Sequence, residues 1–178
     1  QDVDRYLADE GAALTPTQHD LLRWLRKHGT ALTEVLGQEP ATLLHGDFRL
    51  DNICFDDDAG DVVLFDWQTM LAGPGASDLA YFISATLPAD TDEARVDELI
   101  DLYHAELAQR GVDVSRDRLR WQYEVAMLTM LHRLLPTTNP DQAAFEAGSG
   151  LPLLRAWISR IQARLVHVDH QRILEVTA

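Results

Sequence analysis

Leucine and valine side chains recur at helical spacing in the segment 16–36, on one side of a 3.6-residue period. Thr15 and Pro16 supply an N-cap and a first-turn proline, and Gly37 follows the last apolar position. The pattern predicts one long amphipathic helix. Gly29 lies inside it and is expected to loosen it locally.

The same spacing returns after residue 75 and continues to the end of the chain. The predicted helices span 78–87, 90–111 and 115–135, with a shorter helix from 139, a Gly-Ser-Gly break at 148–150 and a last helix from 152. Asp90 with Glu93 resembles a capping box, and Ser115 is a further N-cap residue. Helices therefore make up most of the predicted fold.

Between these helical segments the period changes to that of short strands. The runs are "TLLH" (42–45), "ICF" (53–55) and "VVLF" (62–65). The acidic stretch 56–61 and the "GPG" at 73–75 predict turns. The fold class expected is α+β and mainly α-helical, with a small antiparallel β-hairpin insert and a single domain over residues 1–178.

Composition and charge narrow the classes of function. The chain has 178 residues, 46% of them hydrophobic, which suits one substantial core. Its net charge of −14 argues against nucleic acid and an anionic membrane as partners and favours cationic or neutral ligands. The single cysteine, Cys54, excludes an internal disulfide and is expected to pack as a small apolar group. These features, with no long apolar run, predict a cytoplasmic protein.

Polar residues at the ends of the predicted strands carry the candidate chemistry. His45, Asp47 and Asn52 follow the spacing His-x-Asp-x-x-x-x-Asn of a kinase catalytic loop, and Asp66 comes directly after the third strand. Mg²⁺ prefers oxygen ligands, which Asn52 and Asp66 would supply. Asp47 would then take the proton of an acceptor hydroxyl, with His45 orienting the loop. For Asp51 the sequence favours two interpretations equally, a solvated turn residue and a residue of the site.

The segments "HGDFRLDN", "LFDWQ" and "GASDLAYF", between Leu43 and Phe82, resemble the C-terminal lobe of the aminoglycoside phosphotransferase and choline kinase superfamily. "DWQ" with "DLAYF" resembles its ecdysteroid-kinase-like branch, and "HGDFRLDN" resembles the kinase domains fused to some acyl-CoA dehydrogenases. The resemblance implies a protein-kinase-like fold, with Asp47 as catalytic base and Asn52 and Asp66 as magnesium ligands. It also implies a phosphate contact for Arg49 and a structural role for Asp78, which would bind the catalytic-loop backbone.

Two differences from protein kinases bear on the substrate. Gly46 replaces the arginine that receives an activation-loop phosphate, and the eleven residues between Asp66 and Asp78 are too few for an activation segment. A small-molecule acceptor is therefore favoured. Upstream of Leu43 there is no glycine-rich loop, and the only lysine, Lys27, falls on a predicted helix. The N-terminal lobe that clamps the nucleotide is accordingly expected to be absent from this chain.

The leading hypothesis is a phosphotransferase that moves the γ-phosphoryl group of ATP or GTP to a small-molecule hydroxyl, with a cationic acceptor suiting the acidic chain. The alternative is a catalytically silent kinase-like binding module or pseudokinase. A metal-dependent phosphoesterase would need further Asp or His ligands. His167 and His170 are expected at a surface helix end rather than in a metal site. The aromatic residues expected in the helical core, some of them beside an acceptor pocket, are Tyr81, Trp121, Tyr123 and Trp157.

Overall fold

The computed structural model describes residues 2–56, 60–138, 150–171 and 173–175, without the side chain at position 151. Its helices are α1 (Asp2–Glu10), α2 (Pro16–Leu36), α3 (Ala76–Thr86), α4 (Glu93–Gln109), α5 (Arg116–Leu134) and α6 (Gly150–Leu165). Its strands are β1 (Thr42–Leu44), β2 (Ile53–Asp56), β3 (Asp61–Leu64) and β4 (Leu71–Gly73). The predicted α+β, mainly helical class is confirmed.

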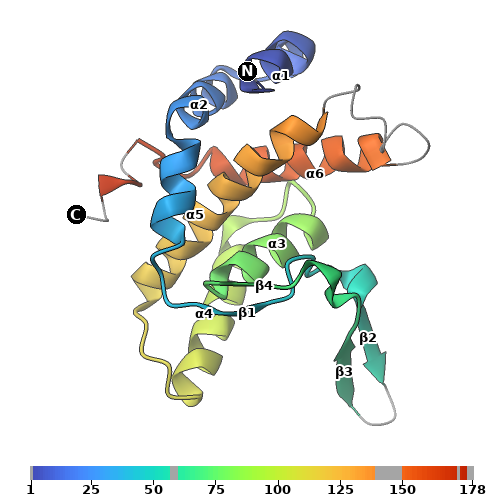
Figure 1. Ribbon diagram of the computed structural model, residues 1–178, viewed down its shortest axis with the longest axis vertical. Helices are drawn as coiled ribbons and strands as arrows, with labels where there is room; N and C mark the ends of the chain where they lie inside the picture. Colours follow the sequence, from blue (N-terminus) through green and yellow to red (C-terminus); the bar gives the residue numbers. More distant parts are fainter. Residues whose placement is uncertain (1, 57–59, 139–149, 172, 176–178) are drawn as a thin grey trace.

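Helix α5 is the centre of the core and packs against α2, α3, α4 and α6 (Figure 1). Its side chains are buried around most of its circumference, including Leu119, Val125, Met127, Leu128 and Leu131. A helix with this much buried surface is stabilised by the helices that surround it. The helical body therefore forms one hydrophobic core, to which the strands are attached at one end.

The predicted start of α2 is confirmed by its capping contacts. The Thr15 hydroxyl accepts a hydrogen bond from the Gln18 amide at 3.3 Å, and the Gln18 side chain accepts one from the Thr15 amide at 2.8 Å. Ser115 caps α5 as predicted. The predicted cap of α4 was wrong by two residues, because Asp92 rather than Asp90 accepts the hydrogen bond from the Ala94 amide.

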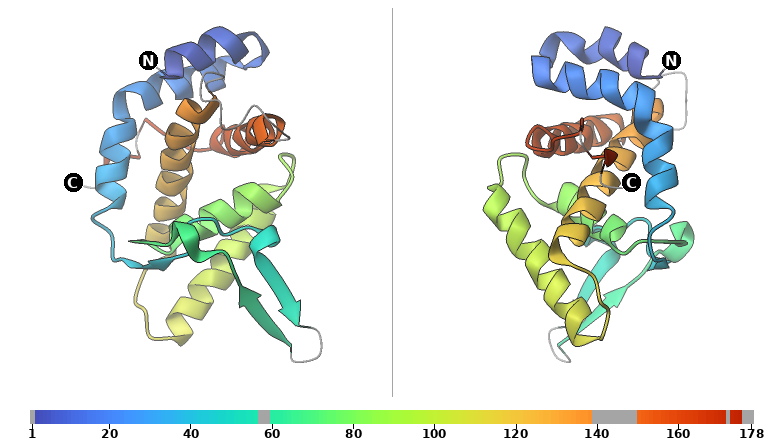
Figure 2. Two further views of the ribbon diagram at one scale, coloured as in Figure 1. Left: turned by 45° about the vertical axis from the view of Figure 1, so that its right-hand side comes forward. Right: turned by 90° about the vertical axis from the view of Figure 1, so that its left-hand side faces the viewer.

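The strands form two separate antiparallel pairs rather than the single insert that the sequence predicted. β1 pairs with β4, with Leu43 opposite Ala72, and β2 pairs with β3, with Cys54 opposite Val63. The β2–β3 hairpin projects away from the helices (Figures 1 and 2). Cys54 is exposed, so the prediction that it packs as an apolar group was wrong. No described helix lies against the hairpin to cover it.

Three predicted features lie wholly or partly outside the described residues. These are residues 57–59 of the acidic turn predicted at 56–61, the whole of the shorter helix predicted from Asn139, and most of the Gly-Ser-Gly break. Helix α1, which the sequence did not predict, packs against α2. None of the helices in the described ranges is long and apolar enough to cross a membrane.

The segment between α2 and β1 is fastened to α5 through Glu39. The Glu39 carboxylate pairs with Arg118 and accepts a hydrogen bond from Gln122 at 2.6 Å. Burial would raise the pKa of Glu39, but the hydrogen bonds from Arg118 and Gln122 outweigh it and lower the pKa. The link fixes where β1, and with it the loop at its end, leaves the helical body.

Helix α2 runs without interruption through Gly29, contrary to the expected loosening. Gly29 is buried, and a Cβ atom built on it would lie 2.3 Å from the His132 ring on α5. This glycine is therefore required by the close approach of the two helices.

We expect Gly29→Ala to lower the free energy of unfolding by about 1–3 kcal/mol because it overpacks the α2–α5 contact. In a His132→Ala background the same change should instead stabilise by up to about 1 kcal/mol, the ordinary helix preference for alanine. Denaturant unfolding of the four variants measures both effects. If Gly29→Ala changes the free energy of unfolding in the same direction with His132 and with His132→Ala, this account is contradicted.

Candidate active site

The loop after β1 is held by the carboxylate of Asp78, in the first turn of α3. Its Oδ2 accepts a hydrogen bond from the His45 amide at 2.7 Å, and its Oδ1 accepts one from the Gly46 amide at 3.0 Å. Gly46 has a φ of +78°, and a Cβ there would lie 2.4 Å from the Thr69 carbonyl oxygen. Only glycine fits this position, because both the conformation and the space exclude a side chain.

His45 joins the loop to the end of β3. Its buried ring accepts a hydrogen bond at Nδ1 from the Asp47 amide, 3.3 Å away, so the proton resides on Nε2. Nε2 then donates to the Phe65 carbonyl oxygen at 2.9 Å. The ring therefore links the backbone of Asp47 with the residue before Asp66.

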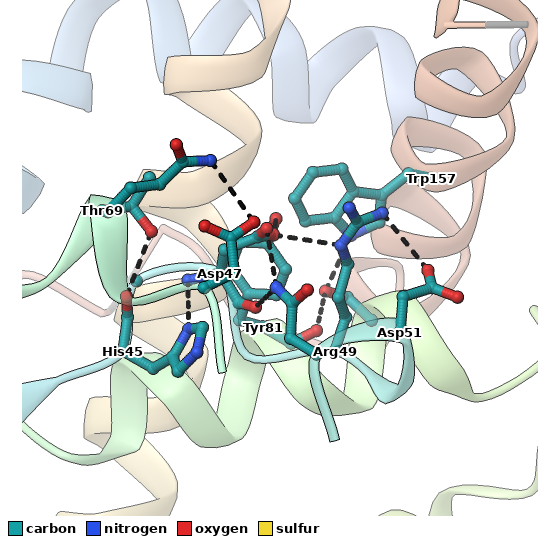
Figure 3. Close-up of polar contacts among 12 residues, drawn as sticks. His45, Asp47, Arg49, Asp51, Thr69, Tyr81 and Trp157 are labelled. Atoms are coloured by element: carbon teal, nitrogen blue, oxygen red, sulfur yellow. Dashed lines mark hydrogen bonds and ion pairs between the residues drawn. The ribbon is translucent and has the colours of Figure 1, made fainter. Parts of the chain in front are cut away.

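Asp47 lies at the centre of the contacts in Figure 3. Its Oδ2 accepts a hydrogen bond from the Asn52 side-chain amide at 2.9 Å, and the same Nδ2 donates to the Asp47 carbonyl oxygen at 2.9 Å. Its Oδ1 accepts a hydrogen bond from the Tyr81 hydroxyl at 2.5 Å. The carboxylate is 19% exposed. It is thus fixed from two sides and still open to a ligand.

Arg49 lies between two carboxylates. Its Nε is 3.3 Å from Asp47 Oδ1, and its Nη1 is 3.3 Å from Asp51 Oδ2 (Figure 3). Asp51 is exposed, so its pairing with Arg49 is screened by solvent. The guanidinium therefore stands beside Asp47 as a fixed positive charge.

Asn52 and Asp66 are the two candidate cation ligands. The Asn52 amide nitrogen is engaged by Asp47, which leaves its Oδ1 as the atom that could bind a metal. Asp66 is exposed and has left-handed backbone, with φ 64° and ψ 57°. Within the described part of the chain, its carboxylate contacts the Gln68 side chain, 3.4 Å away. The structure brings Asp47 and Asn52 into contact, while Asp66 is linked to them through His45 and the Phe65 carbonyl.

Among the described residues no group of three or more His, Cys, Asp or Glu side chains could hold a metal ion. One amide oxygen and one carboxylate nevertheless fit Mg²⁺ with a nucleotide, because this ion keeps several waters and takes its remaining ligands from phosphates. His167 and His170, on the segment after α6, belong to no such group.

The sequence predicted Tyr81 among the core aromatic residues, some of them beside an acceptor pocket, and did not predict its contact with Asp47. It lies one turn after Asp78 on α3, so both side chains share the face that meets the loop. Burial, the hydrogen bond to Asp47 and the Asp47 charge raise the pKa of Tyr81 well above its usual value, which keeps the hydroxyl a donor. Its ring packs on Trp157 of α6 with centroids 4.7 Å apart. Trp121 and Tyr123, in contrast, are buried as predicted.

A cavity of about 500 Å³ adjoins this group of residues. It lies among the end of α2, strands β1 and β4, and helices α3 and α5, with Trp157 on its border. Tyr81 and Gly46 line it, and Tyr81 is the residue that contacts Asp47. A molecule seated in the cavity would therefore approach Asp47 across the Tyr81 hydroxyl.

An aspartate bound to an asparagine five residues later, with a further aspartate beyond a hairpin, is typical of kinase-like phosphotransferases. The chain belongs to the ecdysteroid kinase-like family, whose model matches residues 7–114. A segment of 78 residues is 35% identical to mouse (Mus musculus) acyl-CoA dehydrogenase family member 10 and covers 43% of this chain. The match spans only 7% of that relative. No solved structure matches the chain significantly.

Proposed function

We propose that the chain transfers the γ-phosphoryl group of ATP or GTP to a hydroxyl of a small molecule. The single observation that carries this proposal is the Asp47 carboxylate, which Asn52 and Tyr81 hold beside a cavity large enough for a metabolite. Membership of the ecdysteroid kinase-like family supports the same class of reaction.

In the proposed mechanism Asp47 is the general base. The acceptor hydroxyl gives its proton to the carboxylate while its oxygen forms a bond to the γ-phosphorus, and the bond from that phosphorus to the nucleoside diphosphate breaks. The Asn52 oxygen and the Asp66 carboxylate would hold Mg²⁺, which neutralises phosphate charge when bound. Arg49 stands where its charge could attract the transferred group, and His45 keeps the loop and the start of the Asp66 segment together.

The lobe that clamps the nucleotide is part of the proposal. Nine of the thirteen exposed large apolar side chains of the described residues lie between Leu43 and Leu71, on and beside the strands. Exposed apolar groups gathered in one region are typical of an interface. We place the clamping lobe there, contributed by polypeptide outside these 178 residues. A catalytically silent kinase-like module is the alternative, and it would retain this surface without transferring phosphate.

The test uses the complete gene product that contains these residues, incubated with Mg-ATP and a pool of hydroxylated metabolites. Mass spectrometry detects acceptors that have gained one phosphoryl group. A product that forms with the wild type and disappears with Asp66→Ala supports the proposal. If nothing is phosphorylated and calorimetry detects no Mg-ATP binding, the proposed phosphotransferase is rejected in favour of a catalytically silent kinase-like module.

Removing the Tyr81 hydroxyl is expected to lower turnover about 10- to 100-fold. Tyr81→Phe keeps the ring against Trp157 but deletes the hydrogen bond to Asp47, which is a contact with a charged group. Steady-state kinetics should show the loss in kcat, with nucleotide affinity unchanged. Tyr123→Phe, at a buried tyrosine on α5, is the matched control and should retain wild-type turnover. Equal kinetics for the two variants would remove Tyr81 from the site.

A further inference from the structure

The cavity wall carries charged side chains of both signs, although the chain as a whole is acidic. Two charged side chains of the described residues border it, Asp78 and Arg133. Both oxygens of Asp78 accept backbone hydrogen bonds from the loop, so they are already engaged within the protein. Arg133 forms no ion pair or hydrogen bond within the described residues. The charged side chain at the cavity that is available to a ligand is therefore the exposed cation Arg133.

Thr129 is a second polar group in the cavity wall without a partner. Its side chain is buried, with 5% of the residue exposed, and its Oγ1 makes no hydrogen bond in the described structure. A buried hydroxyl left unpaired costs about 1–3 kcal/mol, so such groups generally have a partner. A ligand in the cavity is the natural partner here, because Thr129 borders it.

Thr129 and Arg133 lie four residues apart on α5, on one face of the helix and about 6 Å apart along its axis. Ala126 and Met130 line the cavity from the same face. Most of the remaining wall is apolar, with Leu36, Leu44, Leu71, Leu134 and Trp157. The cavity thus combines apolar walls with several hydroxyl groups, among them that of Thr129, and one guanidinium. The Tyr81 side chain joins it to Asp47 (Figure 3).

Resting on the proposed function, we infer that the acceptor is an amphipathic alcohol that carries a carboxylate or another anionic group. Its apolar body would lie against the leucines, its hydroxyl would reach Asp47 beside the Tyr81 hydroxyl, and its anionic group would pair with Arg133. The net charge of −14 does not prevent this, because exposed charges beyond about 8 Å are largely screened in physiological salt. A guanidinium can bind a carboxylate through two parallel hydrogen bonds.

The test compares three acceptors that share one carbon skeleton: hydroxydecanoate, decanol and aminodecanol. Each is incubated with Mg-ATP and the complete gene product, and kcat/KM is measured from the phosphorylated product. We expect hydroxydecanoate to be preferred by about tenfold or more over the other two, the scale of one charge-assisted contact. Arg133→Gln should remove the preference, and Arg133→Glu should reverse it toward aminodecanol. Arg110→Gln, at an exposed arginine of the α4 C-cap, is the matched control and should leave the ranking unchanged.

Thr129→Val tests the hydroxyl separately. It should raise KM for hydroxydecanoate severalfold without lowering the melting temperature, because the Thr129 hydroxyl has no partner to lose within the described chain.

Failure of the inference and failure of the proposed function are distinguishable. Phosphorylation that favours decanol or aminodecanol, or a preference that survives Arg133→Gln, overturns the inference and leaves the phosphotransferase intact. If no acceptor is phosphorylated, calorimetry is used to measure the binding of hydroxydecanoate to the wild type and to Arg133→Gln. Binding that weakens in Arg133→Gln supports the anionic site without transfer, and absent binding overturns it.

Discussion

Asp47→Asn is expected to lower turnover about 10²- to 10⁴-fold, the range that a general base contributes. The amide has nearly the same shape as the carboxylate but cannot take the acceptor proton. The contact with Asn52 and the position of the loop, which Asp78 and His45 hold through backbone atoms, should survive the change. The measurement is single-turnover kinetics on the complete gene product with Mg-ATP and a phosphorylatable acceptor.

Nucleotide affinity, measured by calorimetry, should change little in this variant, because Asp47 is not a proposed metal ligand. Asp51→Asn is the matched control: it removes a neighbouring exposed carboxylate that also pairs with Arg49, and it should change turnover less than about threefold. Turnover near the wild-type value in Asp47→Asn would remove the assignment of Asp47 as the base.

Asp78→Ala is expected to lower the free energy of unfolding by about 2–5 kcal/mol. The substitution removes the acceptor of two backbone hydrogen bonds and leaves the amides of His45 and Gly46 without partners beside a buried ring. Hydrogen bonds to charged groups contribute about 1.5–3 kcal/mol each. Denaturant unfolding of the complete gene product measures the loss in the transition that contains this domain.

A second measurement separates this effect from a general loss of stability. At low temperature, where the variant is still folded, kcat should fall because the loop that carries Asp47 loses its attachment to α3. Asp90→Ala, at an exposed residue before α4, is the control and should change stability by less than about 0.5 kcal/mol. An Asp78→Ala protein with normal stability and turnover would show that the loop is held by other contacts.

The helices were predictable where a cap and an apolar stripe coincided. Thr15 with Pro16 and Ser115 marked the starts of α2 and α5 because their side chains contact the backbone of the next turn, which is local information. Strand β4 was not predictable, because three residues show no alternation and depend on pairing with β1, about thirty residues away. Gly29 was misread because the close approach of α5, not the helix itself, requires it.

The candidate site was predictable to the extent that spacing encodes it. His45, Asp47 and Asn52 lie within eight residues, so their mutual contacts follow from one loop. Tyr81 and the cavity could not be read this way, because they depend on where α3, α5 and α6 meet the loop. The spacing of Asp78 and Tyr81 on α3 was the available signal, and it becomes informative once one of the two is known to face the loop.

The β2–β3 hairpin has a consequence for how the domain responds to a bound cation. An isolated two-stranded hairpin is marginally stable, and this one is flanked by Asn52 at its start and Asp66 just beyond its end, with the Phe65 amide bonded to the Asn52 carbonyl at 3.1 Å. A cation that bridges the two residues would clamp the base of the hairpin. Amide hydrogen exchange in the hairpin should then slow when Mg-nucleotide binds, while the amides of α5 already exchange at the slow rate of the core. The hairpin would thus report occupancy of the site from a position remote from the acceptor.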